Sequence, residues 1–501
     1  MSVVIAVDAG TTGVRAIAFD HAGRSVRSAY RELTQHFPRP GWVEHDPDEI
    51  WSAVQQVLGE LTRTLRADGH GVVALGITNQ RETVVAWDRG DGRPLHRAIV
   101  WQDRRTAARC AALADAGHLE VVRRRTGLVL DPYFSATKLE WLFTSGGVDR
   151  GPRTAVGTVD SWLVWKLTDG QAHLTDATNA SRTLLFDITI GEWSEELCDL
   201  FGVPRSVLPE VRPSSGRVAV TAPGAACGAG IPISGVAGDQ HAALFGQACF
   251  AAGEAKCTFG TGSFVLVNVG EACPAPVDGL LTTIAWTLPG PDGSATTTYA
   301  YEGSVFATGA AVQWLRDGLG VIATAPEADA LAASVDDSGG IVVVPAFTGL
   351  GSPWWDPHAR GTILGITRGT GRAHLARAVL EAIAFQTRDV GEAMAAASGR
   401  PLAGLRADGG GASDAVLQLV ADQLGVDVTR PVETDTTALG AAQLAGLAEG
   451  FWTSLDDLRS TWVAQVSFAP QVSRADADAA HSRWLRAVER TRHWTDPPPS
   501  P

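Results

Sequence analysis

The sequence predicts an α/β fold built from two large, related halves. Apolar β-type runs alternate with segments of helical spacing, and two β-turn-β units with Gly/Thr-rich tips occur far apart in the chain. The length of 501 residues exceeds one ordinary core and fits two large domains or three small ones. Two halves with facing tips would form a cleft able to hold a polyphosphate from both sides.

The composition excludes several classes of protein. Apolar residues make up 45% and charged residues 19% of the chain, which excludes wholesale disorder. A net charge of −14 disfavours a protein whose main task is to neutralise nucleic-acid phosphates, although local amides and a metal could still bind a small anion. The six cysteines form no CxxC pair, which argues against a zinc module and a disulfide framework. With no secretory signal visible, we expect a reducing, cytoplasmic setting.

The start of the chain predicts a β-hairpin with a glycine-rich tip. Residues 3–7 are a short apolar run, 8–13 (DAGTTG) form a Gly/Thr turn, and 14–19 resume β character. The tip combines a carboxylate, converging backbone amides and threonine hydroxyls, which suits phosphate binding, with Asp8 holding Mg²⁺ directly or through water. An ordinary turn is the alternative, since the Gly-Lys-Ser/Thr ending of a Walker A loop is absent.

A helix and a buried strand are predicted next. Residues 46–49 supply an N-cap, a first-turn proline and early acids, and apolar residues follow at helical spacing. Residues 72–78 form an apolar strand, and 79–83 lie at its end, where open α/β sheets place ligands. Consecutive strand residues point to opposite faces, so Arg81 and Glu82 can act together only if the chain turns both inward. A surface ion pair is the alternative.

An uncharged stretch precedes a second acidic candidate. The 21 residues 218–238 contain five glycines and two prolines, which predict a loop followed by a buried strand rather than a membrane span. Asp239 and Gln240 come directly after this stretch. A carboxylate next to so apolar a segment requires a partner that stabilises its charge, or it has a functional role. The alternative is a structural Asp that caps a helix starting near His241.

The second half of the sequence repeats the opening pattern. Residues 256–269 predict another β-turn-β unit, whose tip is 259–263 (FGTGS), a weaker phosphate signal that the pairing with 8–13 strengthens. Residues 408–411 (DGGG) form a glycine turn before an amphipathic run that begins near Ala415. The N-terminus of such a helix could receive a nucleotide.

Taken together, these segments resemble the FGGY carbohydrate kinases over nearly the whole chain, from Ile5 to about Trp494. The resembling stretches are 41–47, 76–83, 131–135, 231–240, 242–247, 344–351 and 437–442, with the two family signatures at 133–141 and 361–381. The resemblance implies two ribonuclease-H-like domains of the actin and hexokinase superfamily, with the active site in the cleft between them. It implies an N-terminal domain at 1–247, a C-terminal domain at 248–494 and a disordered tail at 495–501.

The resemblance also implies an activity and a set of site residues. The reaction would be ATP-dependent phosphorylation of glycerol to sn-glycerol 3-phosphate, with Mg²⁺ positioned by Asp8 and with Asp239 as the general base. Glycerol would be held by Arg81, Glu82, Trp101, Tyr133, Asp239, Gln240 and Phe264. ATP would be held by Thr11, Thr12, Gly13, Arg15, Thr261, Gly309, Gln313, Gly410 and Asp414. Taken alone, Trp101 and Tyr133 would instead be assigned to a core or an interface.

Several positions depart from the family pattern. Ala9 stands where Gln is usual, and Gly13-Val14 replaces a typical Ser-Ser, which removes hydroxyl donors near the phosphates. Asp414 replaces the usual Asn at the nucleoside site and puts a negative charge where an amide is expected. His241 replaces a common Gln beside the expected base. These departures delete no reacting group.

Two other functions stay open at this point. A sister kinase for another small polyol or a ketose would differ in whether Trp101, Tyr133 and Phe264 enclose only a three-carbon chain. A non-catalytic relative that binds a ligand or assembles like actin would be expected to lack Asp8 or Asp239, and both are present. The resemblance further implies a homo-oligomer, dimer or tetramer, with no nucleic-acid partner and no stable membrane insertion.

Overall fold

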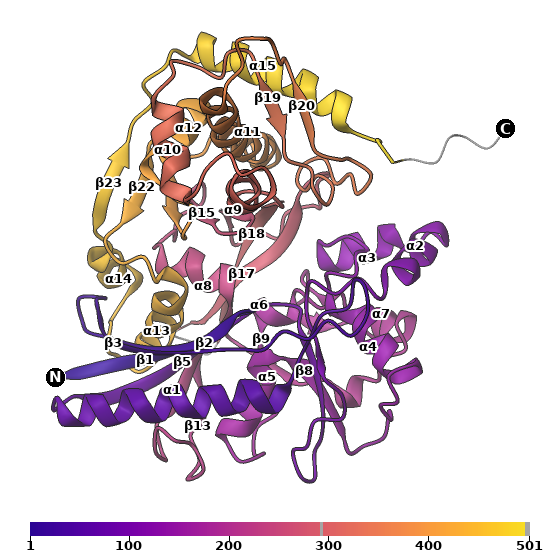
Figure 1. Cartoon of the computed structure of the whole chain (residues 1–501). Helices are drawn as coiled ribbons and strands as arrows, with labels where there is room; N and C mark the ends of the chain where they lie inside the picture. The colour runs from indigo at the N-terminus through magenta and orange to yellow at the C-terminus, as the bar shows by residue number, and fades with distance from the viewer. Residues whose placement is uncertain (291–293, 496–501) are drawn as a thin grey trace.

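The chain folds into two lobes, each built around a large mixed sheet (Figure 1). The structure is a computed structural model that describes residues 1–290 and 294–495, so the expected tail lies outside the described residues apart from Thr495. The sheet of the first lobe contains, in order, β13 (Ser215–Val220), β14 (Pro232–Gly238), β5 (Gly71–Asn79), β1 (Ser2–Ala9), β2 (Gly13–Phe19) and β3 (Ser25–Glu32). The sheet of the second lobe contains β17 (Leu281–Pro289), β18 (Ala295–Val305), β16 (Ser263–Gly270), β15 (Ala255–Phe259), β21 (Leu405–Asp408), β22 (Val428–Pro431) and β23 (Ala464–Phe468).

The two large sheets repeat the same sequence of strand directions. In the first, β3, β2 and β1 pair antiparallel, β1, β5 and β14 pair parallel, and β13 pairs antiparallel at the edge. In the second, β18, β16 and β15 pair antiparallel, β15, β21 and β22 pair parallel, and β23 closes antiparallel. The repeat predicted from the two hairpins is therefore confirmed for six strands of each sheet, and β17 is an additional edge strand of the second.

The remaining elements surround these sheets. A smaller sheet contains β4 (Glu44–His45), β7 (Ala98–Ile99), β6 (Val84–Asp88) and β8 (Thr154–Thr158). Short pairs are formed by β10 (Phe186–Asp187) with β11 (Glu192–Trp193), β9 (Leu174–Asp176) with β12 (Glu210–Arg212), and β19 (Val342–Val344) with β20 (Thr362–Leu364). The helices of the first lobe are α1 (Pro47–Ala67), α2 (Ala107–Asp115), α3 (Leu119–Thr126), α4 (Ser135–Thr144), α5 (Val159–Leu167), α6 (Ala177–Ala180), α7 (Glu195–Leu200) and α8 (Asp239–Gly246). Those that follow are α9 (Gly309–Gln313), α10 (Ala325–Ala333), α11 (Arg372–Ser398), α12 (Asp414–Leu424), α13 (Thr436–Ala448), α14 (Leu455–Thr461) and α15 (Arg474–Thr491).

Helix α1 covers one face of the first sheet, as the sequence predicts. Its N-cap Asp46 accepts a hydrogen bond from the backbone N–H of Asp48, and Pro47 occupies the first turn. The apolar stripe that includes Ile50, Val54 and Leu61 is fully buried against the sheet. Figure 1 shows α1 lying along β2 and β3, which it contacts.

The other face of the first sheet is covered by a helix from far along the chain. Helix α13 contacts β1, β5 and β14 and lies against α8. A Cβ at Gly76 would overlap the carbonyl of Ala441, and a Cβ at Gly440 would overlap the carbonyl of Ala242. Bare glycines thus allow backbone to pack directly on backbone where the two lobes join.

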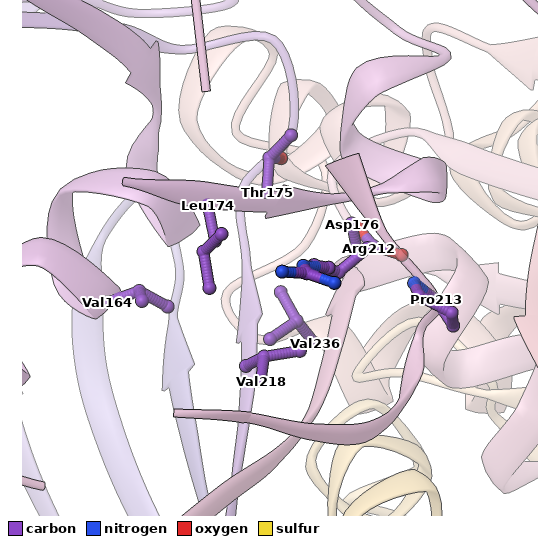
Figure 2. Close-up of a pocket in the computed structure, with 8 residues that line it drawn as sticks. All are labelled: Val164, Leu174, Thr175, Asp176, Arg212, Pro213, Val218 and Val236. Carbon is purple, nitrogen blue, oxygen red and sulfur yellow. The ribbon is translucent and has the colours of Figure 1, made fainter. Parts of the chain in front are cut away.

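The uncharged stretch 218–238 ends in the buried strand β14, as expected, rather than in a helix. Within 1–290 and 294–495, no helix is long and apolar enough to cross a membrane. Figure 2 shows a narrow recess behind β14, where Val218 and Val236 face Leu174 and the neighbouring Asp176. Asp176 caps α6, so this region fixes a helix that reaches the candidate site described below.

We predict that Gly440→Ala destabilises the protein, although Ala favours helices, because its Cβ would collide with the backbone of α8. The expected loss is roughly 1–3 kcal/mol in the free energy of unfolding, the range for overpacked cores. Denaturant titration measures it, with Gly71→Ala as the control, since a Cβ at Gly71 would meet no atom within 4 Å. Equal midpoints for Gly440→Ala and the wild type would contradict the backbone packing.

Candidate active site

The candidate site starts where β5 ends, at the turn 79–83. Glu82 has a φ of 62°, a left-handed conformation that reverses the alternation of a strand. As a result the side chains of Arg81 and Glu82 both face the interior and are only 2% and 1% exposed. The expectation that the chain could turn both residues inward is confirmed, and the alternative of a surface ion pair is wrong.

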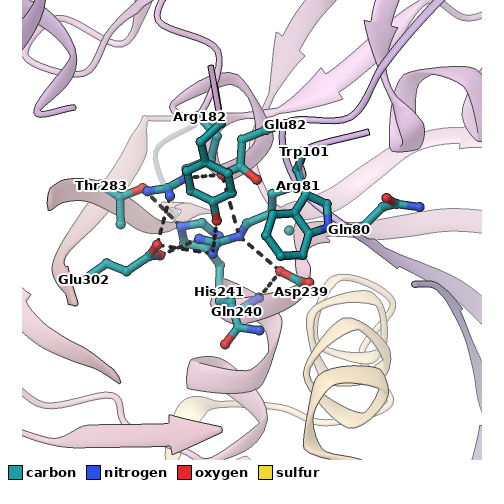
Figure 3. Close-up of polar contacts among 12 residues, drawn as sticks. Gln80, Arg81, Glu82, Trp101, Arg182, Asp239, Gln240, His241, Thr283 and Glu302 are labelled. Carbon is teal, nitrogen blue, oxygen red and sulfur yellow. Dashed lines mark hydrogen bonds and ion pairs between the residues drawn. The ribbon is translucent and has the colours of Figure 1, made fainter. Parts of the chain in front are cut away.

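Four buried charged side chains from both lobes form one network, which we call the ion network: Arg81, Glu82, Arg182 and Glu302 (Figure 3). Glu302 lies on β18 of the second sheet, and Arg182 follows α6. Both terminal nitrogens of Arg81 donate to Glu302. Arg182 donates from Nε to Glu82 at 2.7 Å and from Nη2 to Glu302 at 2.9 Å.

The ion network is buried, but its two arginines balance the charges of its two glutamates. Burial raises the pKa of Glu302, but Arg182 and Arg81 oppose it and bring the pKa down to about 2. Burial raises the pKa of Glu82, and the same two arginines oppose it. Since unpaired buried charges are very costly, each side chain depends on the others to stay ionised.

Asp239 extends this network toward solvent. Its Oδ1 lies 3.1 Å from Nε of Arg81, and its side chain is 30% exposed, compared with 2% for Arg81 and 1% for Glu82. Helix α8 begins at Asp239 itself, with Gly238 as N-cap and no side-chain cap, so the expectation of an Asp that caps a helix starting near His241 is wrong. Burial raises the pKa of Asp239 and Arg81 opposes the rise, which makes the carboxylate a stronger base than an exposed one.

The expected polyol residues converge around Arg81 and Asp239. Trp101 and Tyr133 pack edge to face with ring centroids 5.6 Å apart. The Tyr133 hydroxyl accepts a hydrogen bond from Nη2 of Arg81 at 3.4 Å, and the ring of Phe264 lies 5.8 Å from the Arg81 guanidinium. Trp101, Tyr133 and Phe264 are each only partly buried, as the walls of a small site would be.

Gln240 and His241, which follow Asp239, are held by different partners. The Gln240 carbonyl oxygen accepts a hydrogen bond from the buried ammonium of Lys256, so its amide N–H₂ group is the end left to face another ligand. His241 points to Thr283, with Nε2 and Oγ1 3.1 Å apart. Burial and the charges of Arg81 and Arg182 lower the pKa of His241, so its ring is neutral at pH 7.

The first hairpin tip lies beside this cluster. Burial raises the pKa of Asp8 to about 7, and the nearby charge of Asp239 adds to the rise. The Trp101 indole N–H donates to Thr11 Oγ1 at 2.9 Å, and Thr12 is exposed. Arg15, expected at the phosphates, forms an ion pair with Asp435, which precedes α13.

The remaining members of the expected nucleotide set, apart from Gly13, gather at the ends of the second sheet. Gly309 donates its N–H to the carbonyl of Gly260 at 3.0 Å, beside the exposed Thr261. Gly410 lies in an exposed turn between β21 and α12. Gln313 ends α9 and is exposed. Asp414 starts α12 and pairs with Arg430 at 2.8 Å. Arg430 offsets the negative charge that Asp414 places at the expected nucleoside site.

Gly13 lies in the first lobe, where it begins β2. It is buried, and a Cβ there would overlap the ring of Tyr30. Gly13 therefore allows a close contact with Tyr30, and the Ser that is usual at this position could not be placed there without displacing that ring.

The carboxylate of Asp8 fits a magnesium ion whose other ligands are water and substrate phosphates. Among the described residues, no group of three His, Cys, Asp or Glu side chains is arranged to hold a metal. Mg²⁺ commonly binds through one or two carboxylates together with water and substrate phosphates. Asp8, partly exposed at the tip of the first hairpin, is suited to such a role.

Sequence reasoning missed three charged residues of this site: Arg182, Glu302 and Lys256. Each is fully buried. Arg182 and Glu302 stand among uncharged neighbours, and Lys256 stands between Ala255 and Cys257. Glu302 and Lys256 lie on strands β18 and β15. An ion inside such a strand is rarely fully buried unless it has a partner, and that signal could have marked them.

Comparison with known proteins adds a family and close relatives. Residues 3–246 match the N-terminal domain model, and 255–449 the C-terminal domain model, of the FGGY family of carbohydrate kinases. A glycerol kinase of Bordetella parapertussis is 53% identical, covering 99% of this chain and 98% of the relative. One from Deinococcus radiodurans is 52% identical, covering 98% of each.

Solved structures agree with these matches. A Plasmodium falciparum glycerol kinase crystallised with ADP has a TM-score of 0.92 and 35% identity, covering 98% of each chain. A ligand-bound xylulose kinase from Lactobacillus acidophilus, 22% identical with a TM-score of 0.84, shares the fold.

We predict that Glu302→Gln destabilises the protein strongly, because it removes the carboxylate that contacts both Arg81 and Arg182. Breaking a buried pair from one side costs about 3–5 kcal/mol. Denaturant unfolding measures the loss. The control is Glu120→Gln, whose carboxylate is 90% exposed and lies 3.7 Å from Arg124, with an expected change of less than about 1 kcal/mol. Similar losses in the two variants would contradict the role of the ion network.

Proposed function

This chain belongs to the FGGY family of carbohydrate kinases, and we propose that it transfers the γ-phosphoryl group of ATP to a terminal hydroxyl of glycerol. The product is sn-glycerol 3-phosphate, and Mg²⁺ is the cofactor. Identities of 53% and 54% to glycerol kinases over nearly the whole chain support this choice of substrate. Every position that the resemblance assigns to glycerol carries the expected residue, from Arg81 to Phe264.

The observation that carries the proposal is the placement of Asp239. Its carboxylate is the partly exposed end of a buried charged network, held by Arg81 at 3.1 Å. A general base must face its substrate while its own orientation is fixed, and a neighbouring cation can do the fixing. We assign Asp239 to accept the proton of the attacking hydroxyl as oxygen bonds to the γ-phosphorus and ADP leaves.

The other polyol residues bind and orient the alcohol. In this assignment Arg81 and the amide of Gln240 donate to hydroxyl oxygens, and Glu82 accepts from a hydroxyl. Trp101 and Phe264 form apolar walls for the carbon chain. Most of the rate enhancement in phosphoryl transfer comes from positioning and charge neutralisation, so the fixed hydrogen-bond donors and apolar walls of the polyol site contribute much of it.

The nucleotide is assigned to the two hairpin tips and the second lobe. Thr11, Thr12, Gly13 and Arg15 would line the phosphates from one side and Thr261 from the other. Gly309, Gln313, Gly410 and Asp414 would contact the nucleoside. Mg²⁺, held through Asp8, would neutralise developing charge on the phosphates. Arg15 pairs with Asp435 through Nη1, so a phosphate that bound Arg15 would share this side chain with a contact at the base of α13.

The domain division and the setting complete the proposal. We assign 1–247 to the polyol-binding domain and 248–494 to the nucleotide-binding domain, with Phe264 and Glu302 reaching the polyol site from the second. The free cysteines support a reducing compartment, the cytoplasm. A homo-oligomer is assigned on the family resemblance.

We predict that Asp239→Asn lowers kcat by about 10²–10⁴-fold, because the amide cannot accept the proton. Glycerol binding should weaken only in part, since Arg81 and the walls remain. A coupled ADP-release assay measures turnover, and Asp278→Asn, at a 94% exposed carboxylate, is the matched control. If Asp239→Asn turned over at the wild-type rate, Asp239 would not be the general base.

The same assay, run on the wild type with glycerol, xylulose and a tetritol, tests the substrate. The proposal expects glycerol to have the highest kcat/KM, since the chain is 53% and 54% identical to glycerol kinases. A far higher kcat/KM for xylulose or the tetritol would identify a sister kinase of the family instead.

A further inference from the structure

A ring of hydrogen bonds ties the expected polyol site to the first hairpin tip. The Trp101 indole N–H donates to Thr11 Oγ1 at 2.9 Å, and the Trp101 backbone N–H donates to Thr83 Oγ1 at 3.2 Å. The Thr83 hydroxyl donates to Gln80 Oε1 at 2.9 Å. Gln80 Nε2 then donates to the carbonyl of Gly10 at 3.0 Å, next to Thr11, and closes the ring.

The ring fixes the direction of every hydrogen bond in it. The Gly10 carbonyl can only accept, so Gln80 turns its N–H₂ group to Gly10 and its Oε1 to Thr83. The Thr83 hydroxyl therefore donates to Gln80, and its oxygen accepts from the backbone N–H of Trp101. An indole N–H can only donate, so Thr11 Oγ1 must accept from it. Among the described residues no acceptor is bonded to the Thr11 hydroxyl proton, which is therefore free to point away from Trp101.

We propose that Trp101 is a positioning residue for the nucleotide, acting through Thr11. This proposal rests on the proposed function. Phosphate oxygens only accept, so a hydroxyl whose lone pair is already occupied by an indole N–H is presented to them as a donor. Trp101 also packs against Tyr133 at 5.6 Å, on the polyol side. One side chain thus serves as a wall for the polyol and orients a donor to the phosphates.

The arrangement couples the two substrates. A polyol that packs against the indole restricts its motion and so stabilises the Trp101–Thr11 bond. A phosphate bound by Thr11 holds the indole in place for the polyol. By thermodynamic reciprocity, each ligand must tighten the other by the same factor.

The test compares Trp101→Phe, Thr11→Val and the double variant by calorimetry. The ligands are AMP-PNP with Mg²⁺, which carries the phosphate chain, and AMP, which lacks the terminal phosphates. Each single variant should weaken AMP-PNP roughly 2- to 10-fold, the range of one hydrogen bond, and leave AMP unchanged. The double variant should be no weaker than Thr11→Val alone, because the indole acts through Thr11. Multiplying effects, or an unchanged affinity for AMP-PNP in Trp101→Phe, would overturn the proposal.

A matched control and a second measurement keep the outcome clear. Trp193→Phe also removes an indole N–H that forms a hydrogen bond. That N–H donates to the carbonyl of Pro209 at 2.9 Å and lies outside the candidate site, so the variant should bind AMP-PNP like the wild type.

If Trp101→Phe does not fold, glycerol affinity is measured with and without AMP-PNP. The tightening seen in the wild type should shrink in Thr11→Val, and an undiminished effect would overturn the proposal. A wild type that fails to phosphorylate glycerol would refute the proposed function instead.

Discussion

The carboxylate of Glu302 between two buried guanidinium groups is the interaction on which the rest of the site depends. It reaches from the second sheet into the first lobe and contacts both Arg81 and Arg182. Because ions so deeply buried are stable only when paired, the positions of the two lobes and of Arg81 are set together. Arg81 in turn holds Asp239, the partly exposed member, in a fixed orientation.

The fold brings these groups together through its repeated topology. Each large sheet ends its central parallel strands on the same side as the tip of its antiparallel hairpin, which places Asp8 beside the turn after β5 and Thr261 beside the turn after β21. Helix α13 then joins the two repeats, because it packs on the first sheet while Thr436 at its start donates to Asp408 at the end of β21. The same region also holds the ion pair between Arg15 of β2 and Asp435, which precedes the helix.

Local patterns in the sequence predicted the secondary-structure elements well. Both hairpins, α1, β5 and the turn before α12 follow from apolar periodicity, caps and glycines, which depend on near neighbours. The partners of Arg182 and Glu302 could not be predicted in this way, because Glu302 meets Arg81 across 221 residues of sequence. The inward turn at Glu82 was likewise beyond strand alternation, since it depends on a left-handed backbone at a residue that is not glycine.

The central claim is that a fixed, partly exposed carboxylate faces a small alcohol in line with the nucleotide. A crystal structure with glycerol, AMP-PNP and Mg²⁺ tests it most directly. The account predicts a terminal glycerol hydroxyl within hydrogen-bond distance of Asp239, on the side that faces the γ-phosphorus, with Arg81 still bridging Asp239 and Glu302. Glycerol bound elsewhere, or Asp239 turned away from that hydroxyl, would contradict it.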